Sequence, residues 1–304
     1  MSKIIRIGTR DSELALWQAK TVQQKLTDLG CESVLVPVKS TGDLILDKPL
    51  YELGITGVFT KTLDIAMING EVDIAVHSMK DVPTALPKGI VEAAVLERAV
   101  TEDILVHNNY IPNQESATIA TGSLRRKAQW LHKFPSHNMV DLRGNVNTRM
   151  QKLRDNAWQG AIFAAAGLKR IGLTPEQTIN LDWMIPAPAQ GAMLVVAMEK
   201  DIFCREALAK LNHKQSEICV HIERDFLRKL EGGCTAPIGA LAHIEGETLH
   251  FTGALFSLDG KQKITIEKTC PLHEASNIGE AYAEELLDNG GKSLMEAIKV
   301  EMNA

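Results

Sequence analysis

Apolar and polar positions along the first hundred residues fall into blocks whose period changes from strand-like to helix-like. A helix is predicted over residues 12–29, because apolar residues recur on one face, Ser12 suits the N-cap and Gly30 the C-terminal stop. A shorter helix is expected over 60–69. Short apolar runs around these helices predict strands at 3–8, 33–38, 72–77 and 90–96.

The same rhythm returns from about residue 100. Strands are predicted at 103–107, 117–121, 160–166 and 193–198, and helices at 123–133 and 146–157. Alternation of strands and helices indicates α/β units with mostly parallel sheets covered by helices. The chain is therefore expected to contain two similar α/β lobes.

The last third of the chain has a different pattern. A helical stretch over 201–230 is followed by strands that are separated by "EGE" and "LDG" turns. Two more helices are expected around 273–288 and 292–302. This order predicts a small α+β domain, so the predicted fold class is two doubly wound α/β lobes plus a small C-terminal α+β domain.

Composition and charge narrow the class of protein. A chain of 304 residues with 45% hydrophobic and 23% charged residues is typical of a globular protein with an ample core. The formal net charge of -5 argues against a general nucleic-acid partner. No segment approaches the ~20 apolar residues of a membrane helix, and the N-terminus does not resemble a signal peptide. We therefore expect a cytoplasmic protein without membrane contact.

Cysteine usage agrees with a reducing compartment. The five cysteines form an odd set without a C-x-x-C pair, which argues against a disulfide framework and against a structural zinc site. No metal is expected. Cys234 differs from the others because it stands in a loop, "LEGGCTAPIGA", among glycines and close to a proline. A loop thiol of this kind is more exposed than one in a helix, although a lone loop cysteine is usually inert.

Candidate ligand-binding residues follow a predicted strand. "HSMKDVP" (77–83) comes after a buried type of strand and ends at a proline, so Lys80 and Asp81 are expected on a loop at a strand's carboxyl end. Ligands of open α/β sheets bind at such ends. An ordinary surface ion pair is the alternative for this pair. "STGD" (40–43) offers Thr41 and Asp43, although such residues most often only form turns.

Residues 121–154 carry a local excess of positive charge in an acidic protein. Eight basic residues face one acid, Asp141. Arg125 and Arg126 would occupy the first turn of a helix capped by Ser123, where cations oppose the helix dipole. A bound carboxylate or phosphate would explain them, whereas a solvated basic face is the alternative. Two further sites favour the anion: Arg10 lies between a strand and a helix start, and "LRGNVNTR" places Arg143 and Arg149 around a Gly-Asn turn.

Several motifs taken together resemble those of the porphobilinogen deaminase (hydroxymethylbilane synthase) family. The stretches are "GTRDSELALWQA", "HSMKDVP", "GSLRR", "LRGNVNTR", "AGLKRIGL" and "EGGCTAPIGA", and their order and separation extend over nearly the whole chain. The resemblance implies a transferase of tetrapyrrole biosynthesis that condenses four porphobilinogen molecules, releases ammonia at each step and hydrolytically frees the linear product hydroxymethylbilane. The growing chain is anchored on a dipyrromethane cofactor, which a thioether bond attaches to the cysteine matching Cys234.

The resemblance also implies roles for individual residues. Asp81 is expected to be the catalytic carboxylate, assisted by Arg10 and Arg149. Residues expected to bind the cofactor are Lys80, Asp81, Ser123, Arg125, Arg126, Arg143 and Arg149, with Thr41 and Ser78 as weaker candidates. Residues expected to bind the substrate are Arg10, Arg143, Arg149, Arg170 and Phe59.

Domain boundaries follow from the three-domain build of the family, whose α/β lobes resemble periplasmic binding proteins. The first lobe is expected to comprise residues 1–98 with a return segment, 193–213, the second lobe 99–192, and the C-terminal domain 214–304. "PAPAQGA" (186–192) suits a hinge between the lobes, although a plain linker has the same composition. A monomer is expected by resemblance.

Two departures from the family pattern stand out. "GITGVFTKT" (54–62) has Thr56 where the family commonly has a lysine and Thr62 where it has a glutamate, so altered affinity or loop order is expected rather than lost activity. Ala189 occupies a position where glycine is usual, which restricts the backbone angles of the expected hinge.

Three other classes of protein remain as alternatives. A solute-binding protein or the effector domain of a transcription regulator would share the two-lobed architecture, but we find neither a signal peptide nor a DNA-binding helix-turn-helix, and neither class explains "EGGC" in a third domain. A different enzyme with Cys234 as its nucleophile would need a base, and no histidine lies beside this cysteine in sequence.

Overall fold

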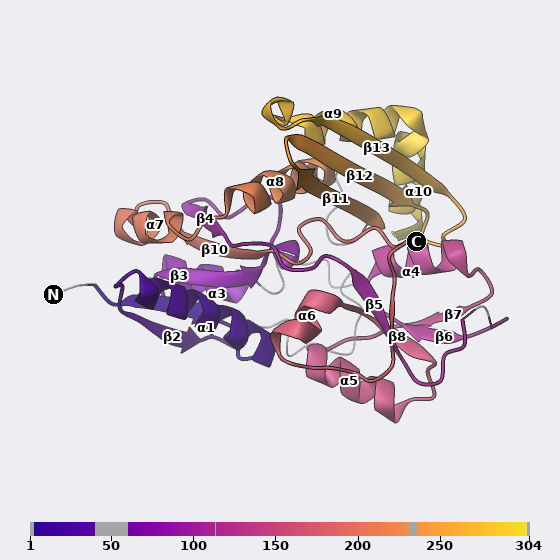
Figure 1. The fold of residues 1–304 in the computed structure, drawn as a ribbon, viewed down its shortest axis with the longest axis horizontal. Coiled ribbons are helices and arrows are strands. Elements are labelled where there is room, and N and C mark those ends of the chain that lie inside the picture. Colours follow the sequence, from indigo (N-terminus) through magenta and orange to yellow (C-terminus); the bar gives the residue numbers. More distant parts are fainter. Residues whose placement is uncertain (1–2, 40–59, 113, 231–235, 303–304) are drawn as a thin grey trace.

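The structure is a computed structural model that describes residues 3–39, 60–112, 114–230 and 236–302 (Figure 1). Predicted site residues that lie outside these ranges are Thr41, Phe59 and Cys234, and the departure at Thr56 lies outside them as well. Within the described ranges, no helix has the length and apolar character needed to cross a membrane.

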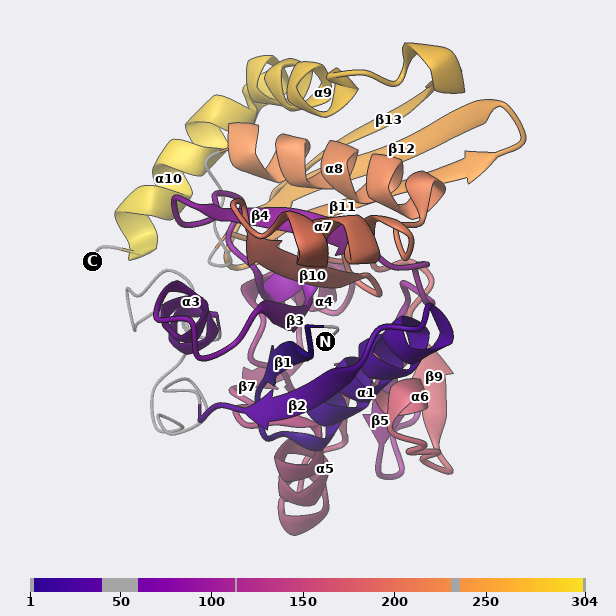
Figure 2. The same ribbon diagram turned by 90° about the vertical axis from the view of Figure 1, so that its left-hand side faces the viewer.

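The first lobe is built on a five-stranded sheet with the strand order β2-β1-β3-β10-β4. Its strands are β1 (Ile5–Thr9), β2 (Ser33–Pro37), β3 (Ile74–Ser78), β4 (Ile90–Val95) and β10 (Met193–Met198). Helices α1 (Glu13–Asp28), α3 (Lys61–Ile68) and α7 (Ile202–Ala209) pack on it, as Figures 1 and 2 show. Ser12 caps α1 as predicted, because its Oγ accepts a hydrogen bond of 3.4 Å from the Ala15 amide.

The second lobe repeats this plan with the strand order β7-β6-β8-β5-β9. Its strands are β5 (Asp103–His107), β6 (Thr118–Ala120), β7 (Asn138–Val140), β8 (Gly160–Ala164) and β9 (Thr178–Asn180), and its helices are α4 (Leu124–Lys133), α5 (Val146–Asp155) and α6 (Ala165–Arg170). The sequence pattern missed β7 and β9, which have three residues each, and extended the strand at β8 into what is the start of α6.

Four of the five strands in each lobe's sheet run in one direction, as expected, and one crossing strand in each runs the opposite way. β10 runs antiparallel to β3 and β4, and β5 runs antiparallel to β8 and β9, while the other pairs in both sheets are parallel. The reason is the path of the chain. Each crossing strand enters its new sheet at the carboxyl ends of the parallel strands: Met193 pairs with Ser78, and Asp103 pairs with Ala164. Both crossings therefore pass beside the edge where ligands of such sheets bind.

The C-terminal unit is an antiparallel sheet, β11-β12-β13, covered by helices (Figures 1 and 2). Its elements are α8 (Lys214–Lys229), β11 (Ile238–Glu245), β12 (Thr248–Phe256), β13 (Lys263–Pro271), a 3-10 turn (Leu272–Glu274), α9 (Ile278–Leu286), a π-type turn (Leu287–Gly291) and α10 (Lys292–Met302). The stretch predicted as helical over 201–230 is two helices, because His213 starts a new one by capping α8. In the core, the rings of Phe226 and Phe251 meet edge to face at 5.1 Å.

The segment that leads into β10 contains a residue in an unusual backbone conformation. Ala189 is fully buried and has a φ of 60°, in the left-handed region that favours glycine. Its amide donates a hydrogen bond of 2.6 Å to Glu223 Oε2. The sequence analysis expected alanine to restrict the backbone here. In the structure, Ala189 adopts backbone angles that are typical of glycine.

Replacement of Ala189 by glycine should stabilise the protein. An alanine in the left-handed region costs roughly 1–2 kcal/mol, and the greater entropy of an unfolded glycine removes about half of that gain, so the expected net change is about +0.5 to +1 kcal/mol in the free energy of unfolding. Urea unfolding measures this change. A destabilised Ala189→Gly variant would contradict the strain at this position.

Candidate functional site

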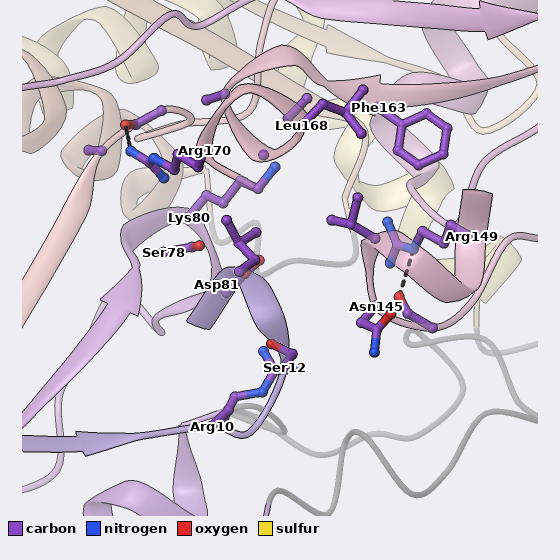
Figure 3. Close-up of a pocket in the computed structure, with 18 of the residues that line it drawn as sticks. Arg10, Ser12, Ser78, Lys80, Asp81, Asn145, Arg149, Phe163, Leu168 and Arg170 are labelled. Atoms are coloured by element: carbon purple, nitrogen blue, oxygen red, sulfur yellow. Dashed lines mark hydrogen bonds between the residues drawn. The ribbon is translucent and has the colours of Figure 1, made fainter. Parts of the chain in front are cut away.

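A cleft lies between the two α/β lobes, where the carboxyl ends of their strands face each other (Figure 3). Its empty space, open solvent included, is about 1100 Å³. The first lobe contributes Arg10, Ser12, Ser78, Lys80 and Asp81 to its lining, and the second lobe contributes Arg126, Arg143, Asn145, Arg149 and Arg170.

The side chains of the first lobe come from the ends of two neighbouring strands. Arg10 follows β1 directly and precedes the cap of α1, and Lys80 and Asp81 lie in a single 3-10 turn, Met79–Asp81, that follows β3. Ser78 lies at the end of β3, and its Oγ accepts a hydrogen bond of 2.8 Å from the side-chain amide (Nε2) of Gln18, which is buried on α1. The loop predicted at a strand's carboxyl end is thus observed, and Asp81 faces the cleft in Figure 3.

Most of the second-lobe side chains stand around the start of α5 and at the end of α6, while Arg126 stands on the first turn of α4. Asn145 caps α5 by accepting a hydrogen bond of 2.9 Å from the Thr148 amide. Arg149 Nε donates to the carbonyl of Gly144 at 2.8 Å, which fixes its side chain on the cleft wall opposite Asp81. Gly144 has a φ of 114° and no room for a side chain, since a Cβ there would lie 2.7 Å from Thr148. This is why the Gly-Asn turn suits the position.

A residue at the end of α6 connects the cleft to the crossing segment. Arg170 Nη2 donates to the carbonyl of Gly191 at 2.6 Å, and its guanidinium lies 5.7 Å from the ring centre of Trp17 in α1. Arg170 therefore contacts both lobes while it lines the cleft.

The electrostatics of the cleft favour an anion. Among the described residues that line it, six have cationic side chains and one, Asp81, has a carboxylate. Burial, with a further contribution from Arg126, lowers the pKa of Lys80 to about 8. Burial likewise lowers the pKa values of Arg149 and Arg170 to about 10, so both guanidinium groups remain charged at neutral pH. A ligand with several carboxylates would complement this local excess of positive charge.

A smaller cavity of about 410 Å³, open solvent included, adjoins the cleft on the side of the first lobe. It shares Arg10 and Asp81 with the cleft and extends to His77, whose side chain is buried. Burial, with the nearby charge of Arg10, lowers the pKa of His77 to about 4. His77 is therefore neutral at physiological pH and adds no charge to the site.

A buried carboxylate behind the cleft holds part of its wall. Asp103 is fully buried, and its Oδ1 accepts hydrogen bonds from Arg126 at 2.7 Å (Nη2) and 3.1 Å (Nε), while Oδ2 lies 2.7 Å from Arg125 Nη1. Burial alone would raise the pKa of Asp103, but the two arginines outweigh it and hold the pKa below its usual range. Asp103 is thus ionised at any pH at which the protein is used.

Gln190 extends this network to the other lobe. Its amide nitrogen donates to Asp103 Oδ1 at 2.9 Å and to the carbonyl of Thr101 at 2.7 Å, and its amide oxygen accepts a hydrogen bond of 3.0 Å from Lys80 Nζ. Sequence reasoning placed Gln190 only in a hinge. One feature of the sequence could have indicated a role for Gln190: it is the only polar side chain in "PAPAQGA", whose other residues are small or apolar.

The predicted site residues divide into three groups. Those that the structure brings together in the cleft lining are Arg10, Ser78, Lys80, Asp81, Arg126, Arg143, Arg149 and Arg170. Arg125 and Ser123 do not line it: Arg125 turns to Asp103 and to the carbonyl of Ile185, and Ser123 Oγ caps α4 by accepting from the Arg126 amide at 3.4 Å. Thr41, Phe59 and Cys234 lie outside the described residues. Thr62 is described, on the first turn of α3.

Loss of the Asp103 charge should destabilise the protein strongly. Asp103→Asn leaves two buried arginines without their carboxylate, for which a cost of about 3–5 kcal/mol is expected. Urea or thermal unfolding measures it, and Asp141→Asn, at an exposed position of the same lobe, serves as the matched control with a change within about 0.5 kcal/mol. A loss below 1 kcal/mol for Asp103→Asn would show that the pair does not organise this wall.

Two solved structures show a limited similarity to this chain. The periplasmic VFT2 domain of BvgS from Bordetella pertussis gives a TM-score of 0.43 at 10% identity and covers 68% of this chain and 86% of its own. An amino acid ABC transporter substrate-binding protein from Streptococcus pneumoniae gives 0.40 at 14% identity and covers 71% and 90%. Likenesses of this size say nothing of what the chain binds.

Sequence comparisons identify the family. Residues 5–206 match the family described as porphobilinogen deaminase, dipyromethane cofactor binding domain, and residues 217–288 match porphobilinogen deaminase, C-terminal domain. Porphobilinogen deaminases from Pelobacter propionicus and Pelotomaculum thermopropionicum are 40% and 41% identical over 97% and 99% of this chain, and over the same shares of their own. A relative from Syntrophomonas wolfei with this name is 41% identical over 96% of this chain and 97% of its own. On the strength of these full-length matches, the chain belongs to the porphobilinogen deaminase family.

Proposed function

We propose that this chain joins four porphobilinogen molecules head to tail on a dipyrromethane group, which a thioether bond holds on Cys234, and releases hydroxymethylbilane by hydrolysis. The observation that carries the proposal is the cleft in which the described lining residues place six cationic side chains around the carboxylate of Asp81. Family membership supports the reaction, since a cofactor binding domain is matched over residues 5–206.

The residues of the cleft fit a dipyrromethane. Each of its pyrroles carries an acetate and a propionate arm, so the group brings several carboxylates, for which guanidinium forks and an ammonium are suitable donors. Residues proposed to hold it are Lys80, Arg126, Arg143 and Arg149, with Ser78 as a neutral donor. When bound, the group supplies the free pyrrole α-carbon to which the first substrate is joined. Arg126 suits this role, because three of its five N–H groups bond to Asp103 and the Ile162 carbonyl and two remain for a ligand.

Arg125 and Ser123 are assigned to the support of Arg126. Arg125 shares Asp103 with Arg126, and Ser123 caps the helix on which Arg126 stands. Both residues therefore act on cofactor binding through the position of Arg126. Thr41 and Phe59 remain proposed contacts to cofactor and substrate, respectively, on the basis of the family motifs alone.

Asp81 is proposed as the catalytic residue. In each condensation the bond between the aminomethyl carbon and nitrogen of porphobilinogen breaks, and ammonia leaves with the electron pair. The electrophilic carbon so formed is joined to a nucleophilic pyrrole α-carbon, which then loses its proton. A carboxylate at the centre of the cleft accepts a hydrogen bond from pyrrole N–H and stabilises the positive charge that develops when ammonia leaves. Asp81 is also placed to take up and return the protons that the two steps exchange.

Substrate carboxylates are proposed to bind to Arg10, Arg143, Arg149 and Arg170. Arg10 and Arg149 stand on opposite lobes and both line the cleft, so a substrate held by the two would lie beside Asp81. This placement supports a role for both in the loss of ammonia, because it fixes the aminomethyl group relative to the carboxylate.

We propose three domains and a cytoplasmic protein, and by family resemblance alone a monomer. The proposed domains are 1–98 with 193–213, 99–192, and 214–304, which agree with a separate sheet for each unit and with β10 as part of the first. The four described cysteines are free thiols, as suits a reducing compartment. A net charge of -5 disfavours nucleic acid as a partner and leaves the small molecule porphobilinogen.

Mass spectrometry of the intact purified protein tests the proposed function. The expected result is an excess of two pyrrole units, mapped to Cys234, and a ladder of single pyrrole additions after porphobilinogen is supplied. Cys234→Ala should show neither the excess nor turnover, and Asp81→Ala should keep the binding of ligand while turnover stops. A wild-type chain that stays bare even after reconstitution with substrate or product would refute the assignment, as would near-normal turnover by Cys234→Ala.

The pH dependence of cofactor uptake should report the charge of Lys80. Its pKa is lowered from 10.5 to about 8, so the positive charge is present below pH 8 and is lost as the pH rises through that value. Uptake by cofactor-free protein should fall about tenfold per pH unit above 8 if it requires this charge. Lys80→Arg should remove this alkaline limb, whereas Lys88→Arg, an exposed control in the same lobe, should keep it. Identical limbs in all three proteins would contradict the role of Lys80.

A further inference from the structure

A buried arginine of the C-terminal unit contacts the turn that carries Asp81. Arg224 lies in the second half of α8 and is 6% exposed. Its Nη2 donates to the carbonyl of Pro83 at 2.7 Å, and its Nη1 donates to the carbonyl of Val82 at 3.0 Å and lies 3.3 Å from that of Met79. These three carbonyls belong to the 3-10 turn itself and to the two residues that follow it.

Two further backbone hydrogen bonds hold the turn, in addition to the buried side chains of Met79 and Val82 and the hydrogen bond from Lys80 to Gln190. The Val82 amide bonds back to the Met79 carbonyl at 3.1 Å, and the Met79 amide bonds to the carbonyl of Ala192 at the crossing segment, also at 3.1 Å. Ser78, at the N-cap position, makes no capping bond with its side chain. The guanidinium therefore holds the exit of the turn while the crossing segment holds its start. Asp81 lies between these two attachments.

The helix that bears Arg224 is firmly placed in the C-terminal unit. Ile222 and Phe226, on either side of Arg224 in sequence, are buried in the core under the antiparallel sheet. Glu223, which is fully buried, accepts hydrogen bonds from the amides of Ala189 at 2.6 Å and Ala242 at 2.7 Å. Two neighbouring residues of α8, Glu223 and Arg224, therefore contact the crossing segment, strand β11 and the turn that carries Asp81.

Sequence adds a second connection. α8 ends at Lys229, and Cys234 follows five residues later. The helix that contacts the turn of Asp81 is therefore the element that leads directly into the segment with the proposed anchor of the cofactor.

We propose that Arg224 is a positioning residue, which fixes the turn of Asp81 relative to the domain that carries the cofactor. This inference rests on the proposed function. Several donors from one planar guanidinium set both the distance and the orientation of a backbone turn, which a point charge or an apolar side chain cannot do. Misplacement of a catalytic group by about 1 Å can cost on the order of 10²-fold in rate. Arg224 would act on the reaction through Asp81, without contact with the substrate.

A simple contribution to the interface between domains is the competing explanation. Arg224 also lies 3.8 Å from Glu92 on β4, and a buried arginine stabilises packing whether or not it affects Asp81. The two roles differ in what they change: an interface residue lowers stability, whereas a positioning residue lowers the rate of the chemical step at unchanged substrate binding.

The test compares Arg224→Met with Arg228→Met in the cofactor-loaded enzyme. Arg228 lies one turn further along α8, is half exposed and pairs with Asp225 and Glu280, so it controls for the loss of a guanidinium from this helix. Arg224→Met should retain the mass of the bound cofactor and a KM within about twofold of wild type, while kcat falls by about 10- to 100-fold. Arg228→Met should keep kcat within about twofold.

A double-mutant comparison with Asp81→Glu separates positioning from stability. If Arg224 acts through the placement of Asp81, then Arg224→Met should cause a clearly smaller fold-change in kcat in the Asp81→Glu background than in wild type. Equal fold-changes in both backgrounds would overturn the proposal. So would a kcat for Arg224→Met that matches Arg228→Met.

Arg224→Lys provides the measurement if the methionine variant does not fold. Lysine keeps the buried charge but cannot span the same carbonyls, so kcat should still fall, by less than for methionine, at unchanged KM. Wild-type kcat for Arg224→Lys would refute the need for the fork. The wild-type pyrrole ladder is recorded first: its absence counts against the proposed function, whereas a normal ladder in wild type and all variants counts only against the role of Arg224.

Discussion

The cationic cleft depends on a buried carboxylate, Asp103, that does not line the cleft itself. A guanidinium or ammonium group withdrawn from water needs a compensating charge, and Asp103 provides one from a fully buried position behind the wall. Its two oxygens hold Arg125 and Arg126. The side-chain amide of Gln190 bridges the same carboxylate to Lys80 on the other lobe, because it donates to Asp103 and accepts from Lys80. Cleft side chains can therefore be held in fixed directions before any ligand arrives, so that binding does not have to order them.

A second buried carboxylate performs the corresponding task between domains. Glu223 pairs with Arg98 at 2.6 Å and accepts amide hydrogen bonds from Ala189 and Ala242, while Arg98 Nε also donates to the carbonyl of Gln190 at 2.8 Å. Gln190 thus belongs to both networks, through its backbone carbonyl in one and its side chain in the other. The crossing segment is fixed at the same residue from the second lobe and from the C-terminal unit, which explains how a strained residue such as Ala189 persists there.

The sequence predicted those features that depend on neighbours along the chain. Ser12 and Ser123 cap helices as expected, and cations placed at strand ends and helix starts converge on one cleft, because the carboxyl ends of strands in both lobes face it. The sequence could not predict whether β5 and β10 pair parallel or antiparallel with their neighbours, because this depends on where the crossing segments enter the sheets. The networks were equally invisible: Gln190 and Asp103 are 87 residues apart, and Arg224 and Val82 are 142 apart.

Arg125 and Arg126 show the limit of motif reasoning at single-residue scale. The two adjacent arginines look equivalent in "GSLRR", but successive residues of a helix point about 100° apart. Arg126 consequently lines the cleft, while Arg125 turns to Asp103 and the Ile185 carbonyl. The motif indicates that both arginines are important, but it cannot tell which one lines the cleft and which one supports the other. The division follows from helix geometry once the position of the cleft is known.

Charge compensation also constrains how a chain can grow in this site. Each added pyrrole brings two carboxylates, while the number of cationic side chains in the cleft is fixed by the sequence. A transfer of bound arms from one arginine to another, or a shift of the lobes that presents others, would match the growing charge. In the proposed arrangement Asp81 stays in register with the anchored cofactor through α8 and Arg224, whereas Arg143, Arg149 and Arg170 belong to the other lobe. Movement between the lobes would then change which arms are held without displacing the catalytic carboxylate from the domain that carries the growing chain.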